Sequence, residues 1–135
     1  MTMVQRPHRK VRFLKVELKV LPKGKCRAFV DLVKDTGDVF VGTADGRDSA
    51  RLDVVAAATG DAIRQIIGGA DDTLVIRGAT LMRTFASKAV VAAASINYEN
   101  QKAYVEGICV VQDDDVHRAA ALAVLHATNR FFNIG

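Results

Sequence analysis

The chain repeats one pattern of about half its own length. When the sequence is shifted along itself by 65 positions without a gap, the order of features in the two halves agrees. The matched positions include Lys23 and Lys88, Gly42 and Gly107, Asp48 and Asp113, and Ala62 and Ala127. Each half contains strands and a turn, then a strand ending at a glycine, an acidic loop and an alanine-rich helix. A unit of this size buries too little apolar surface to fold alone, so we expect the two copies to complete one core.

Hydrophobic periodicity predicts three strands and one helix in each repeat. The predicted strands span about 11–21, 26–33, 39–41, 73–83, 87–96 and 102–111, and the predicted helices about 50–67 and 116–132. This order favours the α+β class, as tandem duplicated βββα units forming antiparallel sheets with the two helices packed on one side. Residues 11–135 are then a single domain made of two repeats, 11–70 and 73–135.

The positive charge is concentrated at the N-terminal end of the chain. The net charge is +4, and residues 1–34 contain ten Lys or Arg against Glu17 and Asp31. Residues 1–10 are predicted to form a basic flexible arm. Clustered basic residues often bind phosphates, which makes a nucleic-acid-binding protein using this arm and the first strand one functional hypothesis. The residues predicted to make those contacts are Arg6, Arg9, Lys10 and Arg12. The alternative is a solvated edge strand whose lysines prevent aggregation.

Both predicted helices are apolar on two sides. One side of each helix is expected to pack on its sheet, and the other to pack against a second helix of the same chain or of another subunit. We favour a homodimer or larger homo-oligomer. The residues predicted to form its interface are Ala56, Gly60, Ala121, Leu125 and Phe132.

No catalytic or metal-binding constellation is recognisable. His117 and His126 are nine positions apart, which is not the spacing of a helical metal pair. An acidic run at residues 113–115 is better explained as a helix N-terminus than as a cation site. Cys26 and Cys109 are expected to be reduced thiols of a cytoplasmic protein. The sequence therefore predicts no enzyme activity, no cofactor, no metal and no membrane span.

The acidic loops of the two repeats occupy equivalent positions between the third strand and the helix. An amino acid could bind there, with its carboxylate on helix N–H groups and its ammonium on Asp48 or Asp113. The residues predicted to bind such a ligand are Gly42, Asp48, Ser49, Gly107, Asp113 and Asp115. The alternative is that these loops only cap their helices.

The two loops carry a family resemblance. The segment 42–49 with its alanine-rich helix, and the segment from Gly107 through 113–115 to 127–130, resemble the C-terminal regulatory domain of 2-isopropylmalate synthase. The chain also resembles small stand-alone proteins of uncharacterised function, seen mainly in bacteria, that share the same duplication. The resemblance implies two βββα units, a dimer, and a site that in the family binds the feedback inhibitor leucine. The family's catalytic barrel is absent here, so the synthase reaction is not implied, and leucine specificity does not carry over.

These observations predict a non-enzymatic, dimerising regulatory or assembly module that senses a small amphipathic ligand such as an amino acid. Nucleic-acid binding is the alternative.

Overall fold

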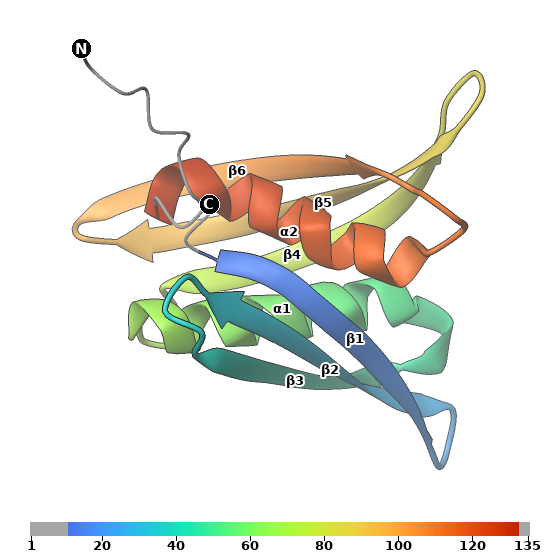
Figure 1. Cartoon of the computed structure of the whole chain (residues 1–135), viewed down its shortest axis with the longest axis horizontal. Helices are drawn as coiled ribbons and strands as arrows, with labels where there is room; N and C mark the ends of the chain where they lie inside the picture. Colours follow the sequence, from blue (N-terminus) through green and yellow to red (C-terminus); the bar gives the residue numbers. More distant parts are fainter. Residues whose placement is uncertain (1–10, 133–135) are drawn as a thin grey trace.

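The computed structural model describes residues 11–132, so the predicted arm at residues 1–10 lies outside the described residues. The chain runs through three strands and a helix, and then repeats that order (Figure 1). The elements are β1 (Val11–Leu21), β2 (Lys25–Lys34), β3 (Val39–Arg47), a short 3-10 turn η1 (Asp48–Ala50), α1 (Arg51–Ile67), β4 (Leu74–Arg83), β5 (Lys88–Tyr98), β6 (Gln101–Val110) and α2 (Val116–Phe132).

Each repeat forms its own antiparallel sheet. The strand orders are β1-β2-β3 and β4-β5-β6, and each sheet carries its helix on one face. Side chains alternate between the two faces of a strand, and in β2 the residues Ala28, Val30 and Leu32 point inward and are fully buried. The predicted α+β class with duplicated βββα units is confirmed.

The two repeats pack together by sharing neighbours. Helix α1 packs on β2 and β3 of its own sheet and also contacts β4, the edge strand of the second sheet. Helix α2 packs on β5 and β6 and also contacts β1, and the two helices touch each other. In Figure 1, α1 lies behind the first sheet and α2 lies in front of the second. Each helix thus covers one sheet and flanks the other, so the core is shared between the repeats.

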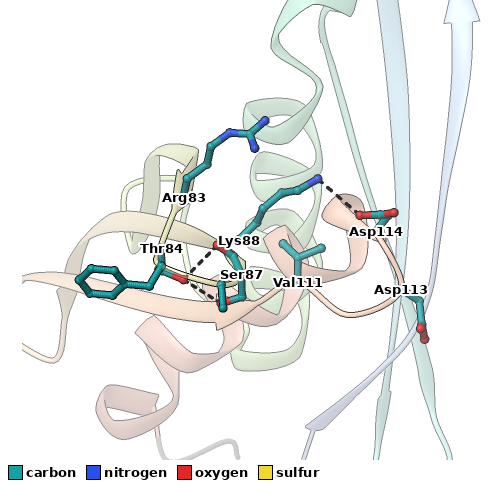
Figure 2. A pocket seen from close by; sticks show the side chains of 9 residues that line it. Arg83, Thr84, Ser87, Lys88, Val111, Asp113 and Asp114 are labelled. Carbon is teal, nitrogen blue, oxygen red and sulfur yellow. Dashed lines mark hydrogen bonds and ion pairs between the residues drawn. The ribbon is translucent and has the colours of Figure 1, made fainter.

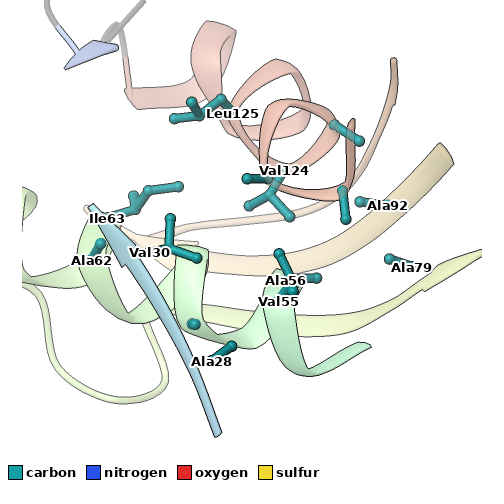
Figure 3. Packing of buried hydrophobic residues seen from close by; sticks show 14 of the residues in the cluster. Ala28, Val30, Val55, Ala56, Ala62, Ile63, Ala79, Ala92, Val124 and Leu125 are labelled. Carbon is teal, nitrogen blue, oxygen red and sulfur yellow. The ribbon is translucent and has the colours of Figure 1, made fainter. Parts of the chain in front are cut away.

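The shared core is built from small and β-branched side chains, because only 6% of the residues are aromatic. Figure 3 shows Val55 and Ala56 of α1, Val124 and Leu125 of α2 and Val30 of β2 within one cluster. All five are buried. Alanine on both helices lets the two backbones approach each other and the sheets closely.

The helix residues predicted to form a dimer interface lie inside this core. Ala56 and Ala121 are 0% exposed, Leu125 is 7% exposed, and Gly60 is buried against Ile76 of β4. The ring of the remaining residue, Phe132, packs edge-on against Tyr98, with ring centroids 5.3 Å apart. The second apolar side of each helix is therefore covered within the chain, which corrects the prediction that a second subunit covers it.

The ungapped repeat holds only from the third strand onward. Gly42 and Gly107 occupy equivalent places in β3 and β6, at the predicted shift of 65. Gly42 pairs with Val30 of β2, and Gly107 pairs with Ala92 of β5. Val30 and Ala92 are 62 positions apart in the sequence, not 65. The two shifts differ by an odd number, and an odd slip in register moves every side chain to the other face of a strand. A shift of 65 is therefore wrong for β2 and β5.

A β-bulge is also repeated. Leu14 in β1 and Arg77 in β4 each interrupt the pairing with the central strand of their sheet. Leu14 and Arg77 are 63 positions apart in the sequence. A bulge strengthens the local twist of a strand, and here both bulges occur in the strand that meets the other repeat's helix.

Helix side chains cover the outer edges of both sheets. The Asp61 carboxylate accepts a hydrogen bond from the Thr43 N–H of β3 at 2.9 Å, and the Gln65 side-chain amide donates one to the Val41 carbonyl of β3. At the position equivalent to residue 61, His126 Nδ1 lies 2.8 Å from the Ile108 carbonyl of β6 and donates to it. Edge groups satisfied in this way are poor templates for an additional strand.

Candidate functional site

The two glycines predicted to bind a ligand allow close helix packing. A Cβ added at Gly42 would overlap the Ala58 carbonyl oxygen and would lie 2.5 Å from the Ala62 nitrogen of α1. A Cβ at Gly107 would overlap the Ala123 carbonyl oxygen of α2. The absence of a side chain lets each helix lie directly on its third strand. This close approach is a physical explanation for both glycines that requires no ligand.

Asp113 lies beside the hairpin between β4 and β5. Figure 2 shows a hollow lined by this hairpin and by the loop before α2, with Asp113 directed away from Lys88. The Lys88 ammonium is instead 3.4 Å from the neighbouring Asp114 carboxylate. Across the hairpin, the hydroxyl of Thr84 lies 2.8 Å from that of Ser87. No residue of the first-repeat loop lines this hollow, so the two predicted loops do not build one pocket there.

Asp115 caps α2. Its carboxylate accepts a hydrogen bond from the Arg118 N–H at 3.0 Å, and its carbonyl accepts one from the Ala119 N–H at 3.2 Å. Both bonds satisfy amide groups that a helix N-terminus otherwise leaves without a partner. Asp115 therefore acts as a helix cap, which is the alternative given above for the acidic loops.

Asp48 and Ser49 do line a hollow, and it lies between the repeats. We call it the inter-repeat hollow, and it is bounded by the start of α1, by β4 and by the start of α2. The polar and apolar groups that line it include Asp48, Ser49, Arg51, Asp53, Leu81 and His117. Of the six residues predicted to bind a ligand, only Asp48 and Ser49 line this hollow.

The inter-repeat hollow holds charges of both signs. The Arg51 guanidinium lies 2.8 Å from the Asp48 carboxylate, and this hydrogen bond raises the pKa of Arg51 above its ordinary value. Asp53 turns its carboxylate to β4, where one oxygen accepts the Ala79 N–H at 2.9 Å. Arg51 and Asp48 keep 41% and 36% of their side chains exposed, so both remain accessible to a solute.

Burial lowers the pKa of His117 below its ordinary value. The neighbouring Asp115 carboxylate acts against this shift, and the nearby Arg51 adds to it. A lowered pKa means that the folded protein favours the neutral imidazole. His117 thus presents a neutral donor and acceptor to the hollow at pH 7.

We expect His117 to make the protein less stable in mild acid. The unfolded chain takes up a proton near the ordinary histidine pKa of about 6.5, whereas the folded chain takes it up only at lower pH. Stability from this group is therefore complete above about pH 6.5 and falls as the pH drops toward the folded pKa. Urea unfolding between pH 7.5 and 5 should show this loss in the natural protein, and the H117Q variant should show a smaller one. An unchanged pH dependence in H117Q would assign the loss to other groups.

Sequence reasoning missed Arg51, Asp53 and His117 as members of one site. Each lies in the first turns of a helix, which was visible in the sequence as a helix start. Their assembly requires α1 to lie beside β4 and the start of α2, and no local pattern encodes that neighbourhood.

The two cysteine thiols do not form a disulfide with each other. Burial, reinforced by the nearby Asp48 carboxylate, raises the pKa of the Cys26 thiol, and burial likewise raises the pKa of Cys109. Both cysteines are free. Within residues 11–132, no three His, Cys, Asp or Glu side chains gather in a metal-binding group. In the same part of the chain, neither helix combines the length and apolar character needed to cross a bilayer.

The residues of the nucleic-acid hypothesis are mostly outside the described residues. Arg12 is exposed on β1, whereas Arg6, Arg9 and Lys10 precede the described range. On the same sheet, the Arg27 guanidinium is bonded to the Asp45 carboxylate at 2.6 Å. This ion pair also raises the pKa of Arg27 and lowers that of Asp45. Part of the basic character of this sheet is thus neutralised within the sheet itself.

Comparison with known proteins returns no match, either to a protein-family model or to a curated protein.

Proposed function

We propose that the protein is a non-catalytic, self-associating module that binds a small amphipathic molecule, such as an amino acid, in the inter-repeat hollow. The observation that carries the proposal is the meeting of Arg51, Asp48 and His117 with apolar side chains at the contact between the repeats. A site at this place is formed by both repeats, so a bound molecule would stabilise their packing. Such coupling between occupancy and domain stability is what a sensing module requires.

The chemistry of the hollow fits a zwitterion with an apolar side chain. The Arg51 guanidinium suits a carboxylate, which it can bind through two parallel hydrogen bonds. The Asp48 carboxylate, now bonded to that guanidinium, suits an ammonium group. Leu81 and Val116 line the same hollow and offer apolar contact. A ligand with both charges would replace the internal ion pair with two external ones.

Binding is favoured over catalysis because the carboxylates of the hollow are already engaged. Asp48 is bonded to Arg51, and Asp53 is bonded to the backbone of β4. The nearby thiol of Cys26 is buried, and its raised pKa keeps it protonated at neutral pH. These groups recognise charge and hydrogen bonds, and none of them is arranged as an activated nucleophile with its base.

Thermal shift against a panel of amino acids and short-chain acids tests the ligand. A ligand present at 100 times its dissociation constant should add about 2.7 kcal/mol to the free energy of unfolding. We expect a stabilising compound to carry both a carboxylate and an ammonium group. Its effect should be lost in R51A and in D48A.

The matched control is R27A, which removes an exposed guanidinium of a similar ion pair on the first sheet. This variant should respond to the ligand as the natural protein does. A stabilising compound that acts equally on R51A, D48A and R27A would place the site elsewhere. A complete lack of stabilising compounds would remove the sensing part of the proposal.

A further inference from the structure

The outer face of the second sheet, turned away from α2, is apolar around Met82 and Val110 and carries Arg77 and Glu106 toward its other end, and it has no covering element among residues 11–132. Its centre is formed by the outward side chains of β5, which are the buried Ala89 and the partly buried Val91, Ala93 and Ser95. Larger side chains stand on either side of this low strip, with Met82, Ile108 and Val110 exposed by 48%, 56% and 55%. An exposed contiguous apolar surface of this kind is typical of an interaction site.

The corresponding face of the first sheet is different. It carries Lys15, Glu17, Lys19, Arg27 and Asp45, several of them joined in ion pairs. Its exposed apolar side chains on β3 are Val39 and Val41, which lie beside these charged groups. The outer edges of both sheets are covered by helix side chains, as described above. Among residues 11–132, the outer face of the second sheet thus carries fewer charged residues and more exposed apolar side chains than the outer face of the first sheet.

We infer that this face binds the same face of a second copy of the chain. The inference rests on the self-association in the proposed function and names the surface responsible for it. Face-to-face packing of two identical sheets requires a twofold axis lying between them. An axis parallel to β5 places β4 of one copy over β6 of the other, and places the small side chains of the two β5 strands in contact.

Apolar residues match under this arrangement. Met82 on β4 and Val110 on β6 both pair with Ala89, so they lie at the same level on opposite sides of β5. The twofold axis brings Met82 of one copy over Val110 of the partner subunit. Thr80 and Ile108 are related in the same way. The large side chains at the margins therefore meet one another, while the low central strip allows the sheets to approach.

The charges on the face match as well. Arg77 occupies the bulge of β4, and its Nε donates to Ser95 Oγ at 2.8 Å, which places the guanidinium on the outer face. Glu106 on β6 pairs with Ala93 at nearly the same level. The axis parallel to β5 therefore brings Arg77 over Glu106 of the partner subunit, twice in each dimer. An axis across the strands would instead place the charged end of one face on the apolar end of the other.

The arrangement is tested by charge reversal and mixing. Sedimentation velocity of the natural protein should show a dimer. In R77E and in E106R each homodimer contains two like-charge contacts, so self-association should weaken by more than about tenfold. An equimolar mixture of the two variants restores both opposite-charge contacts in the heterodimer. The mixture should therefore recover dimer close to the natural level.

The control is K19E, a charge reversal on the outer face of the first sheet, which should sediment as the natural protein does. Circular dichroism and thermal melting establish that each variant is folded. A natural protein that remains monomeric overturns both this inference and the proposed self-association. A dimer that is insensitive to R77E and E106R, or variants that do not recover on mixing, overturns this inference alone.

Discussion

Replacing Gly42 with alanine is expected to lower the free energy of unfolding by about 3 kcal/mol or more, and G107A should act similarly. The added methyl group would overlap a backbone carbonyl oxygen of the facing helix in each case. A backbone atom cannot rotate away as a side chain can, so the whole helix must shift from the sheet. Overpacking in a rigid core typically costs about 1–3 kcal/mol, and a forced backbone shift belongs at or above the upper end of that range.

Urea unfolding followed by circular dichroism measures the effect. The control is T43A, which truncates the exposed side chain next to Gly42 on the opposite face of β3 and should change stability by less than about 0.5 kcal/mol. If G42A were as stable as T43A while losing its response to a stabilising amino acid, the glycine would belong to a ligand site and the packing explanation would be wrong.

Replacing Leu125 with glutamate is expected to abolish the folded state. Leu125 is 7% exposed and packs in the core between the two repeats. A carboxylate there must either lose its hydration without a partner or take up a proton, and an uncompensated buried charge costs several kcal/mol. That is a large fraction of the total stability of a domain of this size.

The L125M variant keeps the apolar character and the volume, and it should cost less than about 1.5 kcal/mol. Far-ultraviolet circular dichroism and sedimentation distinguish two outcomes. Loss of secondary structure in L125E is expected from the intrachain packing. A folded, monomeric L125E would show instead that this helix face joins two subunits. It would then support the dimer interface that the sequence predicted.

Some features of the fold could be derived from local sequence patterns. The period of two in the strands and the alanine-rich helices each depend on neighbours within a few residues. The end of α1 is also local, because Gly68 adopts the left-handed conformation and its N–H bonds to the Arg64 carbonyl. The duplicated βββα order followed from comparing these patterns. Polar groups at helix starts were also visible, and one of them, Asp115, proved to be a cap.

The candidate site could be predicted only in part, because its two halves come from different repeats. Asp48 and Ser49 were identified from the loop that contains them. Leu81 and His117 join them only after α1 packs beside β4. The packing role of the two glycines was missed for a related reason. A strand that ends in glycine before a loop is compatible with a ligand or with a close helix, and the distance to the helix backbone separates the two.

The sequence by itself determined the class of fold, the two repeats and the order of their elements, because periodicity, turns and caps are local properties of the chain. Only the tertiary structure decided which neighbour covers each apolar surface. It placed both apolar sides of the helices inside one chain, changed the register of the central strands relative to the ungapped repeat, and left the outer face of the second sheet open. These outcomes depend on hairpin lengths and on contacts between distant segments. Burial is non-directional, so an apolar pattern specifies that a side chain is covered without specifying the partner that covers it.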